Sequence, residues 1–182
     1  MLTEKPKIFA FAGVESTGKS NCAAYLAYSL HGKLIEEFAR VYLEENSNQY
    51  KHEDFIKIAH GQAELEDQAL RSANAGDILV FDTDYIVIYV WSLIVYGSVP
   101  DWIEQRILSY GPRVYFLMTP EVEWVRDGLR EYPDLKIREA IHQTYIDTLQ
   151  KFGCVYHIIS GDNHSARQLE VLQIARSYLG QD

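Results

Sequence analysis

Lys7-Ile-Phe-Ala-Phe-Ala-Gly13-Val-Glu-Ser-Thr-Gly18-Lys19-Ser20 is the stretch of sequence that decides the fold. A short apolar strand runs directly into the pattern G-x-x-x-x-G-K-S, and the next residues, 21–30, have the composition of a helix. The glycines allow a tight backbone path with inward-pointing N–H groups, and the start of a helix adds partial positive charge. The stretch therefore predicts a phosphate-binding loop, or P-loop, between a strand and a helix.

The residues of this loop have expected roles toward a nucleotide. Lys19 can reach the β- and γ-phosphates, and the hydroxyl of Ser20 can bind Mg²⁺. The backbone N–H groups would face the phosphate oxygens. The predicted phosphate-binding residues of the loop are Gly13, Glu15, Ser16, Thr17, Gly18, Lys19 and Ser20.

Strand-like and helix-like segments alternate along the rest of the chain. Further strands are expected at 33–35, 78–81, 113–118 and 155–159, and further helices at 36–45, 53–75, 85–96, 101–109, 135–152 and from about 164 to 179. The strand at 78–81 is apolar throughout, as in a parallel sheet covered on both faces. The alternation predicts one three-layer α/β domain over residues 1–182, with a parallel sheet.

The composition of the chain argues against some classes of binding partner. The 182-residue chain is 47% hydrophobic, and its net charge of -9 argues against a general nucleic-acid-binding surface. Its longest apolar run, 86–95, is too short to span a membrane and predicts a buried helix. Two cysteines without a motif and no visible signal peptide favour a cytoplasmic protein. We expect a small-molecule partner, no nucleic acid and no membrane, and homo-oligomer formation is left open.

Acidic residues follow two of the expected strands, where parallel α/β sheets bind their ligands. Asp82 is the first candidate to hold Mg²⁺ with Ser20, whereas capping of the next helix suits Asp84 better than Asp82. A phosphoryl acceptor also needs a carboxylate to take its proton, and Glu37 and Asp84 are both candidates. The alternative for each of the two is a salt bridge with Arg40 or simple exposure.

Residues 121–134 combine basic and aromatic side chains in a short segment between a strand and a long helix. Arg126 and Arg130 lie four residues apart, close to Trp124, and Arg138 is a further candidate. Arginines on a lid can close over transferring phosphates. The alternative is a solvated helix face with pairs four residues apart.

Taken together, these stretches resemble the ribosylnicotinamide kinase domain of NadR-type proteins, a branch of the P-loop kinases with an AAA-type ATPase-like domain. The matching stretches are Gly13–Ser20, Glu37-Phe-Ala-Arg40, Gly61-Gln62, Phe81-Asp-Thr-Asp84, Trp124-Val-Arg-Asp-Gly-Leu-Arg130, and Ile159-Ser-Gly161 with Arg167. The resemblance implies a five-stranded parallel sheet in the order 2-3-1-4-5 with a lid. It also implies ATP-dependent phosphorylation of the 5′-hydroxyl of nicotinamide riboside, an alcohol acceptor, with ATP and Mg²⁺ as cofactors.

The resemblance assigns roles to particular residues. Trp124 would stack on the nicotinamide ring, and Arg126 and Arg130 would serve the phosphates. The implied catalytic set is Lys19, Glu37, Asp82, Asp84 and Arg130; the substrate-binding set is Glu37, Arg40, Asp84, Tyr85 and Trp124; the loop beside the adenine contributes Ser160, Gly161, Asp162 and Arg167.

NadR-type proteins also carry an adenylyltransferase domain, for which 182 residues leave no room, so we expect the reaction to stop at the mononucleotide.

Two other hypotheses remain alongside a nicotinamide riboside kinase. A kinase for another nucleoside or cofactor precursor would keep the same fold. A nucleotide-binding switch that hydrolyses ATP or GTP slowly is the third hypothesis, but a Trp beside two Arg suits closure over a second substrate better.

Overall fold

A parallel five-stranded sheet forms the centre of the computed structural model, which describes residues 5–46, 51–125 and 132–181. The strands are β1 (Lys7–Ala12), β2 (Lys33–Ile35), β3 (Ile78–Phe81), β4 (Val114–Met118) and β5 (Val155–Ile159). Their order is β2-β3-β1-β4-β5, and every pair is parallel. The predicted sheet and its order are therefore confirmed.

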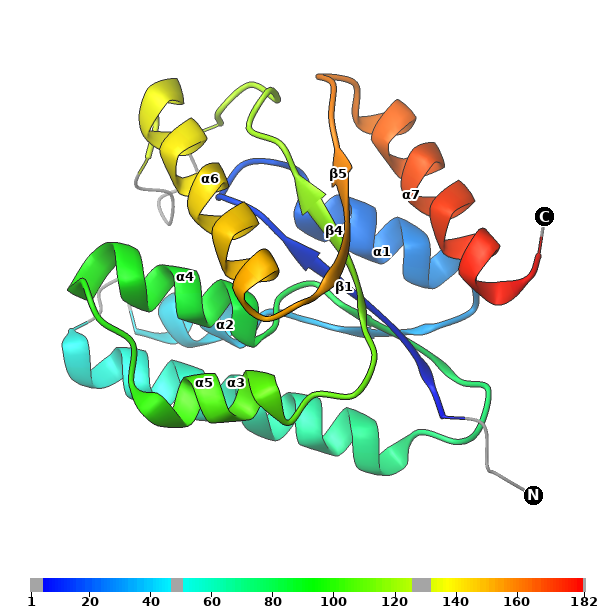
Figure 1. The fold of residues 1–182 in the computed structure, drawn as a ribbon, viewed down its shortest axis with the longest axis horizontal. Coiled ribbons are helices and arrows are strands. Elements are labelled where there is room, and N and C mark those ends of the chain that lie inside the picture. The colour runs from blue at the N-terminus through cyan, green and yellow to red at the C-terminus, as the bar shows by residue number, and fades with distance from the viewer. Residues whose placement is uncertain (1–4, 47–50, 126–131, 182) are drawn as a thin grey trace.

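The described helices are α1 (Lys19–Ser29), α2 (Phe38–Glu45), α3 (His52–Ser72), α4 (Tyr85–Tyr96), α5 (Asp101–Leu108), α6 (Leu135–Lys151) and α7 (His164–Leu179). They cover both faces of the sheet, with α1 and α7 on one side and the α3 to α6 group on the other (Figure 1). The predicted three-layer α/β architecture is confirmed.

Alternation along β1 supplies both halves of the core. Phe9 and Phe11 pack toward α1 and α7, whereas Ile8, Ala10 and Ala12 pack toward the opposite helices. Phe116 on β4 lies 5.2 Å from Phe11, ring centre to ring centre. Successive side chains of a strand point to opposite faces, so one central strand holds the two layers together.

Several helix boundaries differ from those predicted by one to three residues, among them the end of α3 and the start of α2. α3 ends at Ser72 rather than near residue 75, because the carboxylate of Asp77 accepts the N–H of Asn74 at 2.7 Å and fixes a turn. α2 starts at Phe38 rather than at residue 36, so that Glu37 precedes the helix in an extended conformation.

The apolar run at 86–95 lies within α4, and most of its first half is buried. Ile94 and Val95 near its end are more than a third exposed. Among the described residues, no helix has the length and apolar character needed to cross a membrane.

Candidate functional site at the P-loop

The loop between β1 and α1 has the backbone expected of a P-loop. A Cβ on Gly13 would lie 2.7 Å from the carbonyl oxygen of Met118, so only glycine fits between β1 and β4. Gly18 precedes α1 with a left-handed backbone, φ 81°. Thr17 is buried, and its hydroxyl donates to the carbonyl of Val14 at 2.8 Å. The loop is therefore shaped by its own contacts before any ligand binds.

Lys19, the basic residue of the motif, lies across this loop. Its Nζ donates to the carbonyl oxygens of Gly13 at 2.8 Å and Val14 at 3.0 Å. These bonds hold the ammonium over the mouth of the loop, where it can meet the terminal phosphates of a nucleotide.

Asp82 and Glu37 follow neighbouring strands and share an electrostatic environment with the loop. Burial raises the pKa of Asp82, and the Ser20 hydroxyl and the Lys19 ammonium oppose that rise. Burial also raises the pKa of Glu37, with Lys19 lowering it and Asp82 raising it further. The two carboxylates thus lie close enough to the same lysine, and to each other, to interact. Perturbed carboxylates in a recess are typical of functional sites.

Ser20 and Asp82 also fit a magnesium ion chemically. Among the described residues, Asp82 Oδ1 is a buried oxygen without a hydrogen-bond partner, and the residue is only 7% exposed. No cluster of three or more His, Cys, Asp or Glu side chains suited to a metal occurs in the described part of the chain. Mg²⁺ in nucleotide enzymes usually takes one or two protein oxygens and completes its shell with phosphates and water.

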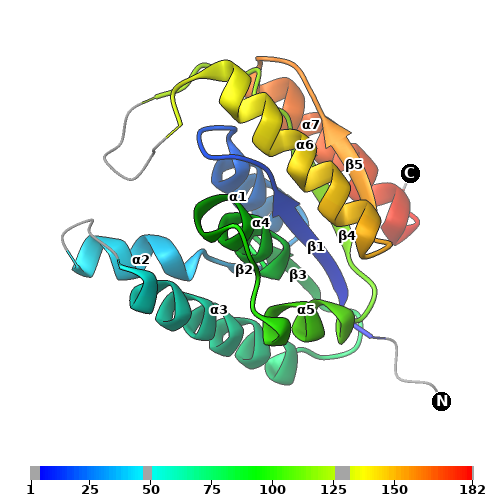
Figure 2. The same cartoon turned by 60° about the vertical axis from the view of Figure 1, so that its left-hand side comes forward.

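A cavity of about 480 Å³ extends from the P-loop between α2, α4 and α6. In Figure 2, α4 and the start of α1 lie between α2 and α6. The polar end of the cavity includes residues 13–21 with Glu37 and Arg40. The sequence predicted almost all of the residues at this end, because the P-loop motif and the carboxyl ends of the parallel strands both indicate a ligand site there.

The other end of the cavity is apolar and aromatic, and sequence reasoning missed it. Val87, Trp91 and Ile94 contribute one face of α4, at spacings of four and three residues. Leu43, Tyr132, Ile141 and Tyr145 complete this wall. The spacing within α4 was the one available signal, but a helix face that looks like core in the sequence can equally line a cavity.

Asp84 and Tyr85, both expected to bind substrate, do not line the cavity. Asp84 is fully buried and caps α4 by accepting the N–H of Ile86 at 2.9 Å, which confirms the capping interpretation. Its other oxygen accepts from Arg113 at 3.1 Å and from the Tyr115 hydroxyl at 2.7 Å. Both carboxylate oxygens of Asp84 therefore have hydrogen-bond partners within the fold.

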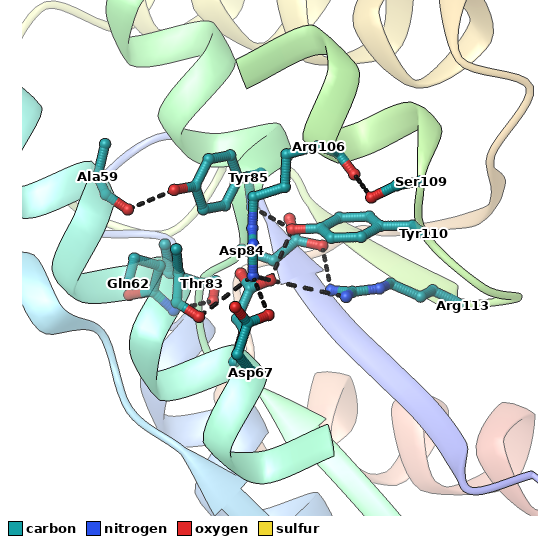
Figure 3. A network of polar contacts seen from close by, with 12 residues as sticks. Ala59, Gln62, Asp67, Thr83, Asp84, Tyr85, Arg106, Ser109, Tyr110 and Arg113 are labelled. Carbon is teal, nitrogen blue, oxygen red and sulfur yellow. Dashed lines mark hydrogen bonds and ion pairs between the residues drawn. The ribbon is translucent and has the colours of Figure 1, made fainter. Parts of the chain in front are cut away.

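Tyr85 belongs to the same buried network (Figure 3). Its hydroxyl donates to the carbonyl of Ala59, and the guanidinium of Arg106 lies 4.7 Å from the centre of its ring. The network also contains Glu66, which accepts from the Tyr110 hydroxyl at 2.7 Å. The structure therefore gives Asp84 and Tyr85 a supporting position behind the site.

The described parts of residues 121–134 contact the tip of the P-loop. Glu15 Oε1 accepts the indole N–H of Trp124 at 3.1 Å and the backbone N–H of Tyr132 at 2.7 Å. Ser16, with a left-handed φ of 57°, accepts the N–H of Val125 at 3.0 Å. The side chains of Glu15 and Ser16 therefore hold this segment, and Trp124 is not among the residues lining the cavity. Arg126 and Arg130 lie outside the described residues.

Two buried arginines connect the loop to its surroundings. Arg138 Nη2 donates to the carbonyl of Ser16 at 3.2 Å, and is thus a support for the loop. Arg167 is 0% exposed and donates to the carbonyls of Thr17 at 3.0 Å and Gly161 at 2.6 Å. Arg167 therefore fixes the exposed residues Ser160, Gly161 and Asp162 relative to the P-loop rather than facing a ligand itself.

The fold and the loop define a P-loop nucleotide-binding domain. A family model described as an AAA domain matches residues 8–167, and the chain belongs to this family.

Individual relatives extend the comparison. The chain is 25% identical over 178 residues to the trifunctional NAD biosynthesis/regulator protein NadR of Escherichia coli (strain K12), a match covering 94% of this chain and 42% of that protein. A crystal structure of NadR protein in complex with NR shares 23% identity and a TM-score of 0.80, over 96% of this chain and 52% of that one. A NadR complex with NAD and AMP-PNP has 22% identity and a TM-score of 0.73, over 96% and 50%. The chain thus spans about half the length of these relatives, and the expected resemblance to NadR-type proteins is confirmed.

Proposed function

We propose that this chain is an ATP-dependent kinase that phosphorylates the 5′-hydroxyl of nicotinamide riboside to give nicotinamide mononucleotide. The observation that carries the proposal is the continuous cavity, which joins a P-loop to a partly buried carboxylate and then to an aromatic wall. A nucleotide site alone would need only the first of these parts. The relatives crystallised with NR and with AMP-PNP support the same pair of ligands.

The phosphate end of the cavity suits Mg²⁺-ATP. Backbone N–H groups of the loop and the Lys19 ammonium would bind the phosphates, and Ser20 and Asp82 would hold the ion. Mg²⁺, when bound, supplies positive charge to the phosphates and helps to fix their orientation. The 160–162 loop, which Arg167 attaches to the P-loop, is the proposed neighbour of the adenine.

Glu37 is the proposed general base. It lines the cavity, whereas the buried Asp84 is held by Arg113 and Tyr115. In the transfer step, the 5′-oxygen forms a bond to the γ-phosphorus, the bond from that phosphorus to the bridging oxygen of ADP breaks, and Glu37 takes the hydroxyl proton.

The aromatic wall suits a flat cationic ring. Nicotinamide riboside carries a pyridinium, and the faces of aromatic rings attract cations. Trp91, Tyr132 and Tyr145 line the cavity beyond Glu37. We therefore propose these side chains as the ring-binding set, while Trp124 attaches the 121–134 segment to Glu15.

The decisive experiment measures ATP consumption with Mg²⁺ in the presence of nicotinamide riboside, adenosine, uridine or no acceptor. We expect stimulation by nicotinamide riboside, with the mononucleotide as product. Stimulation by another nucleoside alone would keep the kinase and change its acceptor. Slow hydrolysis unaffected by every acceptor would contradict the proposal and favour a nucleotide-dependent switch.

A further inference from the structure

Gln62, in the middle of α3, joins the two loops that carry the candidate carboxylates. Its side-chain Oε1 accepts the backbone N–H of Phe38 at 2.9 Å, and its Nε2 donates to the backbone carbonyl of Thr83 at 2.9 Å. Phe38 follows Glu37, and Thr83 follows Asp82. Figure 3 shows Gln62 directed toward Thr83. One amide group therefore binds the backbone next to each carboxylate.

The bond to Phe38 gives a partner to the first N–H group of α2. The first N–H groups of a helix have no partner within the helix, and the residue before the helix usually supplies one from its side chain. Glu37 occupies that position but makes no side-chain capping bond. Gln62 binds the first N–H of α2, and Glu37, whose side chain does not cap the helix, lines the cavity.

The start of α2 depends strongly on this contact with α3. α2 has eight residues, and none of them is fully buried. Gly61 permits the approach, because a Cβ at that position would lie 2.2 Å from Cε1 of Phe38. Gln62 itself is 0% exposed, so water cannot readily replace either of its bonds.

Two hydrogen bonds fix the backbone at Asp82 and Thr83. The N–H of Asp82 donates to the carbonyl of Ile35 at 3.0 Å, which extends the ladder between β2 and β3 by one residue. The bond from Gln62 to Thr83 then fixes the next peptide. The two loops therefore share a sheet connection and an amide bridge.

We propose that Gln62 is a positioning residue for phosphoryl transfer, which sets the separation between Glu37 and Asp82 on either side of Lys19. The proposal rests on the proposed kinase function. Gln62 touches neither substrate nor metal ligand side chain; it acts through the two backbones. A displacement of about 1 Å of a reacting group can cost on the order of 100-fold in rate, so a bridge of this kind has a kinetic consequence.

The test compares Gln62→Met, which keeps the length of the side chain but has no amide, with Gln68→Met on the exposed side of the same helix. We expect kcat to fall roughly 10- to 100-fold in Gln62→Met, with the KM values for ATP and acceptor changing less than about threefold. Gln68→Met should behave as the wild type. A kcat within about twofold of the wild type, or raised KM values with kcat unchanged, would overturn the proposal.

A second measurement does not depend on the acceptor. The Phe38 amide should lose protection against hydrogen exchange in Gln62→Met and keep it in Gln68→Met; unchanged protection would refute the bridge. If Gln62→Met fails to fold, Gln62→Glu replaces it, since a carboxylate can accept from Phe38 but not donate to Thr83, and we expect an intermediate kcat. Wild-type turnover with nicotinamide riboside is measured alongside and tests the kinase function separately. If there is no turnover, hydrogen exchange at the Phe38 amide alone decides whether Gln62 bridges the two loops.

Discussion

Glu37 is the residue at which the two ends of the cavity meet. It precedes α2 in an extended conformation, lines the cavity and interacts with Lys19 and Arg40 as well as with Asp82. Glu36, one residue earlier, is exposed. From the sequence alone, Glu37 and Asp84 are equal candidates for the carboxylate that takes the acceptor's proton, since both follow strands. Burial separates them, because Asp84 lies behind the sheet edge among Arg113 and Tyr115.

We expect Glu37→Gln to lower kcat by about 100- to 10,000-fold, the usual contribution of a general base. Since burial raises the pKa of Glu37 above 4.5, and the ionised form accepts the proton, the wild-type rate should fall with decreasing pH at a higher pH than an ordinary glutamate would cause. The measurement is a pH profile of kcat, with Glu36→Gln as the control. A profile that Glu37→Gln leaves unchanged would remove Glu37 from the reaction.

Lys19→Ala should reduce turnover by about 100-fold or more, the typical effect of removing one donor aimed at developing charge. The fold should persist, because the hydrogen bonds from Lys19 Nζ to the carbonyls of Gly13 and Val14 lie within the P-loop itself. Turnover and circular dichroism are measured together, and exposed Lys33 provides the matched Lys33→Ala control. Near-normal activity of Lys19→Ala would exclude the P-loop from catalysis.

At the scale of elements, α4 shows what a sequence can and cannot reveal. Its bounds agree with the prediction, Tyr85 to Tyr96, because a long apolar run between Asp84 and Gly97 has clear ends. Its function as a cavity wall was not predicted. Whether Trp91 faces the core or a cavity depends on α2 and α6, which come from distant parts of the chain. The same holds for Gln62, whose partners are 24 and 21 residues away.

Trp91 in the wall of α4 and Trp124 beside the P-loop should have different kinetic effects. Trp91→Ala should raise the acceptor KM about tenfold while leaving the ATP KM nearly unchanged, since a cation against an aromatic face contributes about 1 to 2 kcal/mol when desolvated. Trp124→Ala should affect both KM values alike, because its indole N–H binds Glu15 in the P-loop. Steady-state titrations of each substrate provide the values. A selective acceptor effect in Trp124→Ala would return the ring-binding role to Trp124.

At the scale of the whole molecule, the buried network of Figure 3 connects three helices to the sheet and carries unequal charge. Arg106 and Arg113 face three carboxyl groups, those of Glu66, Asp67 and Asp84. The Asp67 side chain is 43% exposed, so water screens its charge, whereas the side chains of Glu66 and Asp84 are 0% exposed. Burial raises the pKa of Glu66 to about 7 and also raises the pKa of Asp84, with Arg113 opposing both rises, so the Glu66 carboxyl keeps a proton below about pH 7.

This proton makes stability depend on pH. Between the ordinary value of 4.5 and about 7, the folded chain holds a proton at Glu66 that the unfolded chain releases, so the free energy of unfolding should fall as pH rises through this window. The effect is at most about 3 to 4 kcal/mol, from a rise of the pKa from 4.5 to about 7 at about 1.4 kcal/mol per unit of pKa. Urea unfolding at pH 5 and pH 7.5 measures it. Glu66→Gln should lose this dependence relative to the wild type, and an identical pH dependence in both proteins would refute the assignment.

The position of β1 has a consequence for how the chain folds during synthesis. Its neighbours in the sheet are β3, whose Ile78 pairs with Lys7, and β4, whose Val114 pairs with Phe9. Closing such large loops before any strand contact forms is slow, and parallel pairing is slow for the same reason. β1 therefore leaves the ribosome long before either partner strand exists, and its phenylalanines cannot complete their packing until Phe116 of β4 has been made. The strand that ends in the P-loop is thus made before both of its partner strands and is a late participant in the folded sheet.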